Sequence, residues 1–473
     1  MLRLLQFSNY FFLVYYAASN LVYLVLLIVA FVASAKHRLR LASMRLEQLK
    51  SSPFTPPITV LVPARNEQKS IVENVEAMLE LDYPALEVIV INDGSSDGTL
   101  AELMAAYQLR PVNQLYVSEI RSAQVRRIYA SQKEPRLVVL DKQSGGSKAD
   151  AINAGLNAAT GAYVCVVDAD SILEKDALLR IMSSVFSDTA SVVGVGGIVR
   201  VLNGSKVEHG AVSQVCLPRR PLEVLQVVEY LRAFLVGREA WASFDMLPII
   251  SGAFGVFRTD LVRRVGGFRA NSIGEDLDLV VRMHRYLLDH RELYRIAFVP
   301  DPTCWTEVPA DLGSLGRQRA RWQKGLFDVL WSNRDMVFRP RYKRLGCFML
   351  PYLWTFELLA PVVEALGYLS IIASALLGVL STVLMLQFLV FGYAFATMIS
   401  IGSVLLEELT YRRYNRSRDV ARLVAYCLLE HLPYRQLNMV WRLYGMWQYL
   451  RGDVAWGSMR RAGLGKLQHA SSQ

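Results

Sequence analysis

Three long apolar runs most constrain how this chain can fold. Residues 10–35, 349–378 and 379–406 are each long enough to span a hydrocarbon core of about 30 Å. The second and third runs follow one another almost without a linker, which predicts a helical hairpin that crosses the membrane and returns. These runs accommodate the high share of hydrophobic residues, 53% of a 473-residue chain, and leave room for a large soluble domain between them.

Basic residues flank the apolar runs. Lys36, Arg38 and Arg40 follow the first run, and Arg412 and Arg413 follow the third. Cytoplasmic ends of membrane spans carry an excess of Lys and Arg, so we expect these ends, and the central domain, in the cytosol. The net charge of +10 therefore favours membrane lipid as a partner, and we expect no nucleic acid.

Two features of the membrane part leave alternatives open. Residues 420–450 are apolar but carry charges and are broken by Pro433, which favours a kinked interfacial or re-entrant element over a full crossing. Glu357 and Glu364 lie seven residues apart, which predicts that they share a helix face. They would either line a polar pathway or pair with nearby arginines, since acidic groups rarely face lipid.

The five cysteines show no C-x-x-C spacing and their number is odd. This pattern predicts neither a disulfide framework nor a zinc site. We expect buried, reduced thiols, as in a protein that faces the cytosol.

The central region alternates between short β-rich runs and helical patterns. Such alternation predicts an α/β fold with a mostly parallel sheet and helices on both faces, in which ligands bind beyond the carboxyl ends of the strands. The expected strands are 58–62, 86–91, 137–140 and 163–167, and the expected helices begin near Glu67, Asp97, Lys148 and Glu174.

Polar motifs follow each of these four strands, and their common placement is stronger evidence than any one of them. A turn such as residues 92–99 could alone be an ordinary N-capped helix start. At a shared sheet edge, however, the side chains would line one crevice. They are Arg65 and Glu67 after the first strand, Asp93 after the second, Lys148 after the third, and Asp168 and Asp170 after the fourth.

Two acidic pairs suggest specific chemistry. Asp168 and Asp170 at a strand end can hold a hard cation such as Mg²⁺ or Mn²⁺, which would neutralise a leaving diphosphate. Glu275 and Asp276 precede a helical pattern at residues 277–287. They are either an acidic pair favoured by the helix dipole, or they include a general base that takes a proton from an acceptor hydroxyl.

Two further segments suggest an acceptor site. Residues 318–322, Gln-Arg-Ala-Arg-Trp, lie on an amphipathic stretch before the second apolar run. Their arginines would contact either lipid phosphates or a diphosphate, whose geometry guanidinium matches. Ser251 and Gly252 follow an apolar, strand-like run and could form a small-residue loop that lines an acceptor channel.

Taken in order, these motifs, ending in Gln-x-x-Arg-Trp, resemble glycosyltransferase family 2 over residues 58–330. The resemblance is to its membrane-embedded processive synthases of cellulose, chitin, hyaluronan and poly-N-acetylglucosamine. It implies a GT-A fold at the bacterial inner (plasma) membrane. It also implies inverting, metal-dependent transfer from UDP-GlcNAc or UDP-Glc to a growing polysaccharide, with translocation of the polymer as a further step. Single addition to a lipid acceptor is the alternative, and a non-catalytic channel or nucleotide sensor is a more distant one.

The resemblance also assigns residue roles. Trp456-Gly457-Ser458 looks like a gating segment of these synthases. Many relatives have more membrane helices than the three expected here, so an accessory membrane subunit or a second copy of the chain is a further expected partner. By resemblance, Arg65, Glu67 and Asp93 would frame the uridine, and Lys148 and Asp168 would contact the nucleotide. Asp170, with Asp168, would bind the metal, and Asp276, beside Glu275, would act as the base. Gln318 and Arg321 would bind the diphosphate, and Trp322 would lie under the acceptor sugar.

The expected domain organisation follows from these assignments. It comprises an N-terminal membrane helix with a basic linker (1–45), a cytosolic GT-A domain (46–310), an amphipathic interface helix (311–345), a membrane hairpin (346–408) and an interfacial or re-entrant segment with a basic tail (409–473).

Overall fold

The chain forms two compact units, which we call the sheet unit and the helical unit. The computed structural model describes residues 2–43, 46–113, 115–186, 192–208, 210–414 and 416–453, so the motif at 456–458 lies outside the described residues. Of the described residues, the sheet unit contains Arg40–Cys216 and Leu247–Val308, and the helical unit contains those up to Leu39, Leu217–Met246 and residues 309–453. The segment Leu217–Met246, expected within the cytosolic domain, thus groups with the helical unit.

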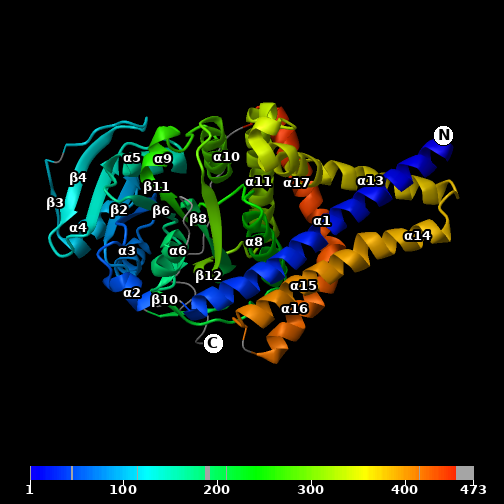
Figure 1. The fold of residues 1–473 in the computed structure, drawn as a ribbon, viewed down its shortest axis with the longest axis horizontal. Coiled ribbons are helices and arrows are strands. Elements are labelled where there is room, and N and C mark those ends of the chain that lie inside the picture. The colour runs from blue at the N-terminus through cyan, green and yellow to red at the C-terminus, as the bar shows by residue number, and fades with distance from the viewer. Residues whose placement is uncertain are drawn as a thin grey trace. The chain divides into compact units, whose positions relative to one another are not determined.

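The sheet unit is built on one ten-stranded sheet (Figure 1). Its strand order is β3-β4-β5-β2-β1-β6-β11-β8-β12-β7, and β9 (Lys206–Glu208) and β10 (Ala211–Gln214) form a separate pair. The strands of the large sheet are β1 (Ile58–Ala64), β2 (Leu86–Asp93), β3 (Leu109–Pro111), β4 (Val125–Ser131), β5 (Leu137–Lys142), β6 (Tyr163–Val167), β7 (Ile172–Leu173), β8 (Val192–Val201), β11 (Phe254–Arg258) and β12 (Arg295–Thr306).

The four strands expected from the sequence form the centre of this sheet and are parallel, as predicted. β1 pairs with β2 and β6, and β2 pairs with β5, all in parallel. These strands are almost wholly buried because Val, Ile and Leu fill both faces. Antiparallel strands flank this centre: β4 pairs with β5, and β11 pairs with both β6 and β8, so the sheet as a whole is mixed.

Helices connect the parallel strands and cover both faces of the sheet. The crossover β1-α3-β2 moves toward one edge of the sheet, whereas β5-α5-β6 moves toward the other. Because such crossovers are right-handed, α3 and α5 lie on opposite faces, as Figure 1 shows. The carboxyl ends of β1 and β6 therefore flank a topological switch point, where α/β sheets bind ligands. The helices of this unit are α2 (Leu46–Ser51), α3 (Ile71–Leu79), α4 (Thr99–Tyr107), α5 (Lys148–Ala158), α6 (Ala177–Phe186), α9 (Thr259–Arg264) and α10 (Glu275–Asp289).

The helical unit contains the apolar runs. Its helices are α1 (Leu2–Ser43), α7 (Pro221–Tyr230), α8 (Arg238–Ser243), α11 (Leu312–Ser332), α12 (Leu350–Tyr352), α13 (Ala360–Leu376), α14 (Thr382–Phe388), α15 (Phe395–Thr410), α16 (Ser417–Leu429) and α17 (Arg435–Leu450). The π-helical segments η1 (Leu231–Gly237), η4 (Leu345–Met349), η5 (Leu353–Leu358), η6 (Leu389–Ala394) and η7 (Glu430–Tyr434) join several of them, and η2 (Arg334–Met336) and η3 (Pro340–Tyr342) are short 3-10 turns.

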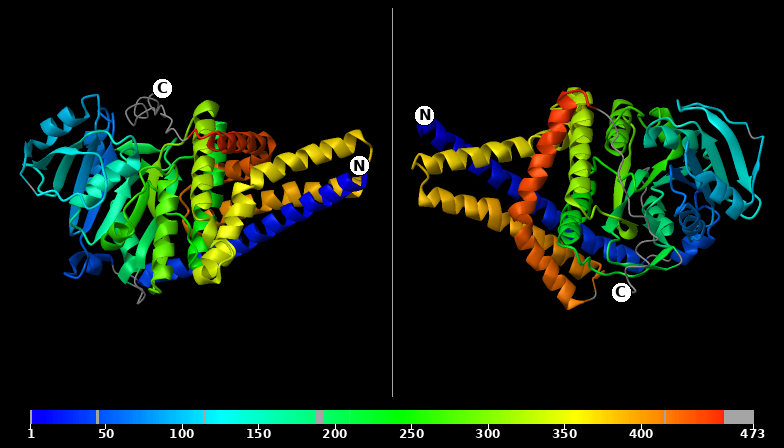
Figure 2. Two further views of the ribbon diagram at one scale, coloured as in Figure 1. Left: turned by 90° about the horizontal axis from the view of Figure 1, so that it is seen from above. Right: turned by 180° about the vertical axis from the view of Figure 1, so that it is seen from behind.

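Among the described residues, two helices are long and apolar enough to cross a membrane, Leu5–Leu41 and Thr382–Thr410. A third candidate is a pair, Leu345–Leu358 and Ala360–Leu376, bent by 45° at its junction. The second and third apolar runs thus form helices that fold back on one another, with a bend in the first of them (Figure 2), and their crossing of a membrane stays a prediction. Polar groups along α1 are satisfied within the unit, since Asn9 donates to Ser374 Oγ at 2.7 Å and accepts from Ser370 Oγ at 2.8 Å.

Glu357 and Glu364, which the sequence predicts on one helix face, both contact the same neighbouring helix, α17. Glu357 lies on η5 and Glu364 on α13, on either side of the junction. Both acids pair with arginines of α17, which is one of the alternatives that the sequence leaves open. Arg435 contacts Glu364 at 2.7 Å, and Arg442 lies 3.7 Å from Glu357.

The kink expected in residues 420–450 is present at Pro433, where the backbone of Leu432 is not helical. It separates α16 from α17, so this stretch is no single straight span.

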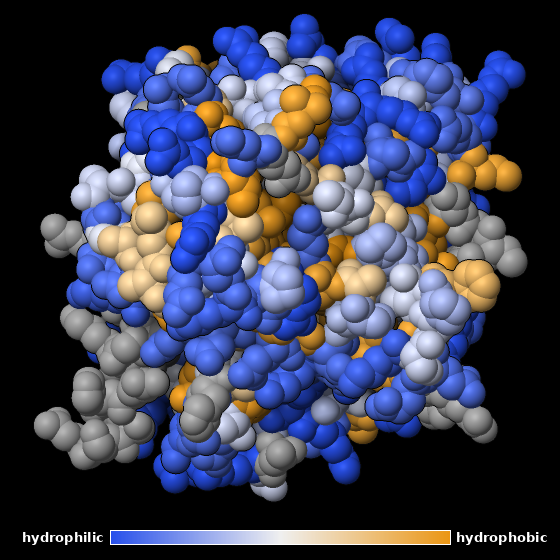
Figure 3. Space-filling model, turned by 90° about the vertical axis from the view of Figure 1, so that its left-hand side faces the viewer, coloured by the Kyte–Doolittle hydropathy of each residue, from blue (hydrophilic) through white to orange (hydrophobic). Residues whose placement is uncertain are grey.

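Surface character differs between the two units. The face drawn in Figure 3 shows mostly hydrophilic residues, with hydrophobic ones in smaller groups between them. The candidate spans instead expose large apolar side chains, among them Leu21, Val32, Leu369 and Leu386, each more than half exposed. Such exposure in water would be costly, and it is what a lipid-facing helix requires.

Candidate active site

The acidic motif after β6 forms a closed turn. The backbone N–H of Ser171 donates to the carbonyl of Asp168 at 3.0 Å, which closes a turn that contains Asp168 and Asp170. The buried amide of Asn74, on α3, donates to the carbonyl of Ala169 in the middle of this turn. The two carboxylates are therefore held on a rigid turn at the edge where the sheet changes direction.

Lys148 connects this turn to the neighbouring loops. It is the first residue of α5, and its ammonium forms an ion pair with Asp168 and donates to the carbonyl of Gly252 at 2.8 Å. Burial disfavours the charged form of Lys148, but the carboxylates of Asp168, Glu275 and Asp276 outweigh burial and raise the pKa of the lysine. Lys148 thus carries a fixed positive charge among three acids.

Asp276 completes this chain of contacts. It lies in the first turn of α10, as predicted, and its Oδ2 accepts from the backbone N–H of Gly252 at 3.4 Å. Its other oxygen accepts from the N–H of Leu277 at 2.8 Å. A helix N-terminus attracts a negatively charged side chain, which favours an acidic residue at this position.

The loop that contains Ser251 and Gly252 differs from its expectation in one respect. The apolar residues before it, 246–250, form no strand, and the strand β11 begins after the loop, at Phe254. These apolar residues pack in the core without forming a strand, and a short apolar run in a sequence does not distinguish the two cases.

The loops after β1 and β2 are tied to each other. The side chain of Asn66 accepts from the N–H of Ser96 at 2.8 Å, and the N–H of Glu67 donates to Thr99 Oγ1 at 2.9 Å. These bonds hold residues 65–70 outside the helix, which is why α3 begins at Ile71 and not near Glu67. The Arg65 side chain is exposed at the end of β1, and Asp93 is buried at the end of β2.

The sheet unit thus brings one set of predicted residues together, by contact or charge: Asp168, Lys148, Gly252, Glu275 and Asp276. Asp170, Ser251, Arg65, Glu67 and Asp93 lie on the same strand-end turns or the loops beside them. Asp168 and Asp170 are suitable ligands for a hard cation, because both offer carboxylate oxygens. The described residues contain no cluster of three or more metal-binding side chains, so water and substrate phosphates would have to supply the other ligands.

The Gln-x-x-Arg-Trp motif lies on α11 of the helical unit. Gln318 is buried, Arg321 is half-buried, and Trp322 is 40% exposed. Their expected contacts with a diphosphate and an acceptor sugar stay predictions. Arg319 is only 3% exposed, so it does not contact lipid phosphates.

Sequence reasoning missed two buried ionic groups. Arg319 pairs with Glu229 of α7 at 2.8 Å and stacks on Trp322, with 4.3 Å between guanidinium carbon and ring centre. In the sheet unit, Lys142 is wholly buried between Asp93 and Asp150. Its signal in the sequence is a lysine at the end of an apolar strand, where a buried charge requires a partner.

The five cysteines are free; Cys165, Cys304 and Cys427 are buried, as expected, whereas Cys216 and Cys347 are only half-buried. Burial raises the pKa of Cys304, and so do the charges of Asp168 and Asp170, although a hydrogen bond with Ser171 opposes them. The thiol behind the acidic turn therefore stays protonated and is not a nucleophile.

A mixed, mostly parallel α/β sheet with carboxylates and a lysine gathered beyond its strand ends is typical of nucleotide-binding enzyme domains. The profile of the family described as "Glycosyltransferase like family 2" matches residues 56–125 and 116–325, more than half of the chain. The chain therefore belongs to glycosyltransferase family 2.

Curated relatives share this region. The chain is 28% identical over 295 residues to the poly-β-1,6-N-acetyl-D-glucosamine synthase of Staphylococcus epidermidis, and 30% identical over 297 residues to that of Staphylococcus aureus strain COL. Each match covers 62% of this chain and 60% of the relative. Among solved structures, a mannosyltransferase from Pyrobaculum calidifontis in complex with GDP-Man and Mn²⁺ is similar at a TM-score of 0.48 and 21% identity. That match covers 86% of this chain and 98% of the mannosyltransferase.

Proposed function

We propose that this chain transfers a sugar, with inversion, from a UDP-sugar to a growing polysaccharide at the cytosolic face of a bacterial inner membrane. One observation carries the proposal, the line of contacts from Asp168 through Lys148 and Gly252 to Asp276. It joins the residues proposed to bind the donor phosphates to the residue proposed to act as base. The similarity to poly-N-acetylglucosamine synthases supports UDP-GlcNAc as the donor ahead of UDP-Glc.

In this mechanism Asp276 accepts the proton of an acceptor hydroxyl. The hydroxyl oxygen then forms a bond to the anomeric carbon of the donor sugar. The bond from that carbon to the β-phosphate oxygen breaks, and UDP leaves with the electron pair. Lys148 contributes a positive charge beside the leaving phosphates, and Glu275 adds to the negative field that holds it there.

Asp168 and Asp170 would hold Mg²⁺ or Mn²⁺, which would neutralise charge on the leaving diphosphate. Arg65, Glu67 and Asp93 would frame the uridine, and Ser251 and Gly252 would line the acceptor. We further propose that Gln318 and Arg321 bind the diphosphate and that Trp322 stacks under the acceptor sugar.

A donor screen tests the proposal. The purified full chain in lipid nanodiscs is given UDP-GlcNAc, UDP-Glc or UDP-galactose with Mg²⁺ or Mn²⁺, and UDP release is measured. We expect fastest release from UDP-GlcNAc and loss of release with EDTA. Release from none of the donors, in a chain that still binds UDP, would contradict the proposal.

A further inference from the structure

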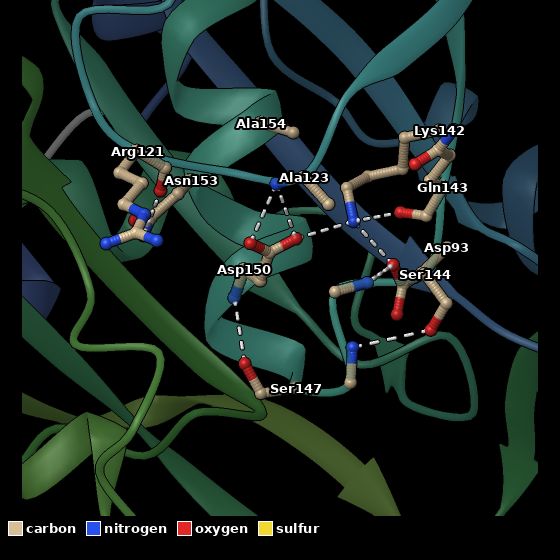
Figure 4. A network of polar contacts seen from close by, with 12 residues as sticks. Asp93, Arg121, Ala123, Lys142, Gln143, Ser144, Ser147, Asp150, Asn153 and Ala154 are labelled. Atoms are coloured by element: carbon tan, nitrogen blue, oxygen red, sulfur yellow. Dashed lines mark hydrogen bonds and ion pairs between the residues drawn. The ribbon is translucent and has the colours of Figure 1, made fainter.

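Lys142 is a charged residue that is buried completely. It ends β5, and the parallel register of β2 and β5 places it opposite Asp93. Its ammonium uses all three N–H groups (Figure 4): it contacts Asp93 Oδ1 at 2.5 Å, Asp150 Oδ1 at 2.6 Å and the carbonyl of Gln143 at 2.8 Å. Its charge is therefore matched within the protein and directed at fixed acceptors.

Both carboxylates are also held by backbone N–H groups. Asp150 accepts from Ala123 through both oxygens, at 2.9 and 3.2 Å, and Asp93 Oδ1 accepts from Gly145 at 3.1 Å. Gly145 approaches so closely that a Cβ there would lie 1.9 Å from Asp150 Oδ1, so only glycine fits. The orientation of Asp93 is thus fixed by two donors on one oxygen.

The second oxygen of Asp93 is not used in this way. Within the described part of the chain, Oδ2 forms no hydrogen bond, and Figure 4 shows it pointing away from Lys142. A carboxylate pinned by one oxygen presents the other as a pure acceptor in a fixed direction. Such an acceptor matches a ring N–H, which uracil carries at N3, and it opposes the lone pair that cytosine carries there.

We propose that Lys142 is a positioning residue for nucleotide recognition: it orients Asp93, so that the site selects a base with a ring N–H. This inference rests on the proposed function, in which Asp93 meets the base. The alternative is that Lys142 only fastens β2, β5 and α5 together, a role that would not depend on which base is bound.

Nucleotide selectivity separates the two roles. Affinities of the full chain in nanodiscs for UDP and CDP, with Mn²⁺, are measured by calorimetry. We expect the wild type to prefer UDP at least tenfold. Lys142→Met should lower the affinity for UDP at least tenfold and the affinity for CDP much less, so that the preference for UDP is lost. Lys133→Met, which removes an exposed lysine of the same unit, should leave both affinities unchanged.

Lys142→Met leaves two carboxylates buried together, so a second variant guards against loss of folding. Lys142→Met/Asp150→Asn removes one charge of each sign, keeps an acceptor for Ala123, and should show the same loss of preference. A folded variant of either kind with wild-type affinities would overturn the inference. Failure of both to fold would assign Lys142 to stability alone and overturn it equally.

The proposed function fails in a different way. Absence of a UDP preference in the wild type would count against a UDP-sugar donor. Retention of the preference in Asp93→Asn would count against the contact of Asp93 with the base. Loss of the preference in Asp93→Asn, with its retention in the Lys142 variants, would remove only the role of Lys142.

Discussion

Single residues at this site owe their properties to their neighbours. Asp276 gains a helix N-terminus and the N–H of Gly252, and Lys148 gains three acids that outweigh its burial. Neither property belongs to the residue type alone. The chemistry proposed for each therefore depends on contacts that can be removed one at a time.

Asp276→Asn should remove the base and leave the fold intact, because the amide oxygen can still accept from Leu277 and only the longer contact with Gly252, at 3.4 Å, is lost. We expect transfer to fall by about 100-fold or more, with the affinity for UDP within about twofold of the wild type. Radiolabel transfer and calorimetry on the same preparation measure the two quantities. Asp260→Asn, on the exposed surface of α9, is the control. Unchanged turnover in Asp276→Asn would refute the assignment of Asp276 as the base.

His284 should make the stability of the sheet unit depend on pH. Burial lowers the pKa of this α10 side chain to about 4, against the opposing effect of its bond to the carbonyl of Leu247. Between pH 6.5 and 4 the unfolded chain binds a proton that the folded chain does not, so stability is lost as the pH falls. The loss at pH 5 should be about 2 kcal/mol.

Thermal unfolding in nanodiscs at pH 7.5 and pH 5 measures this effect. His284→Gln should reduce the difference between the two pH values, whereas His290→Gln, at an exposed position after α10, should keep it. Equal pH dependence in wild type and His284→Gln would contradict the assignment.

At the scale of elements, α11 is held in the helical unit by close packing and by a buried ion pair. Gly445 of α17 lies so near that a Cβ would be 2.4 Å from the carbonyl oxygen of Ala320. Glu229 of α7 accepts from Arg319 at 2.8 Å and from Tyr434 at 2.6 Å. The helix that carries Trp322 is therefore fixed to both α7 and α17.

Glu229→Gln should leave the Arg319 guanidinium buried without a matching charge. We expect a loss of about 3–5 kcal/mol, measured as a lower unfolding temperature. Glu408→Gln is the matched control, because its pair with Arg412 is exposed and its atoms lie 4.0 Å apart. That change should cost less than about 1 kcal/mol. Equal effects of the two substitutions would show that the Arg319 pair contributes no more than a surface pair.

Element by element, the sequence predicted what local pattern can encode. The four central strands and the start of α10 follow from hydrophobic periodicity and were confirmed. The start of α3 was displaced because loop bonds from Asn66 and Glu67 depend on another loop. Lys142 was missed since only the register of β2 and β5 brings it to Asp93. The bend between Glu357 and Glu364 is not revealed by their spacing in the sequence.

At the scale of the whole molecule, the proposed topology places the loop between α13 and α14 outside the cytosol and the sheet unit inside it. In a cysteine-free background, Leu377→Cys should react with a membrane-impermeant maleimide in intact cells. Leu293→Cys, equally a change of an exposed leucine, should react only after permeabilisation. The reverse pattern would contradict the orientation.

The central claim is that this family 2 glycosyltransferase extends a polysaccharide. Its most direct test is the size of the product made by the full chain in proteoliposomes from radiolabelled UDP-GlcNAc and Mn²⁺. We predict labelled polymer whose length increases with time and which Asp168→Asn/Asp170→Asn does not make. Label found only on a singly glycosylated lipid, or in no product at all, would contradict the account.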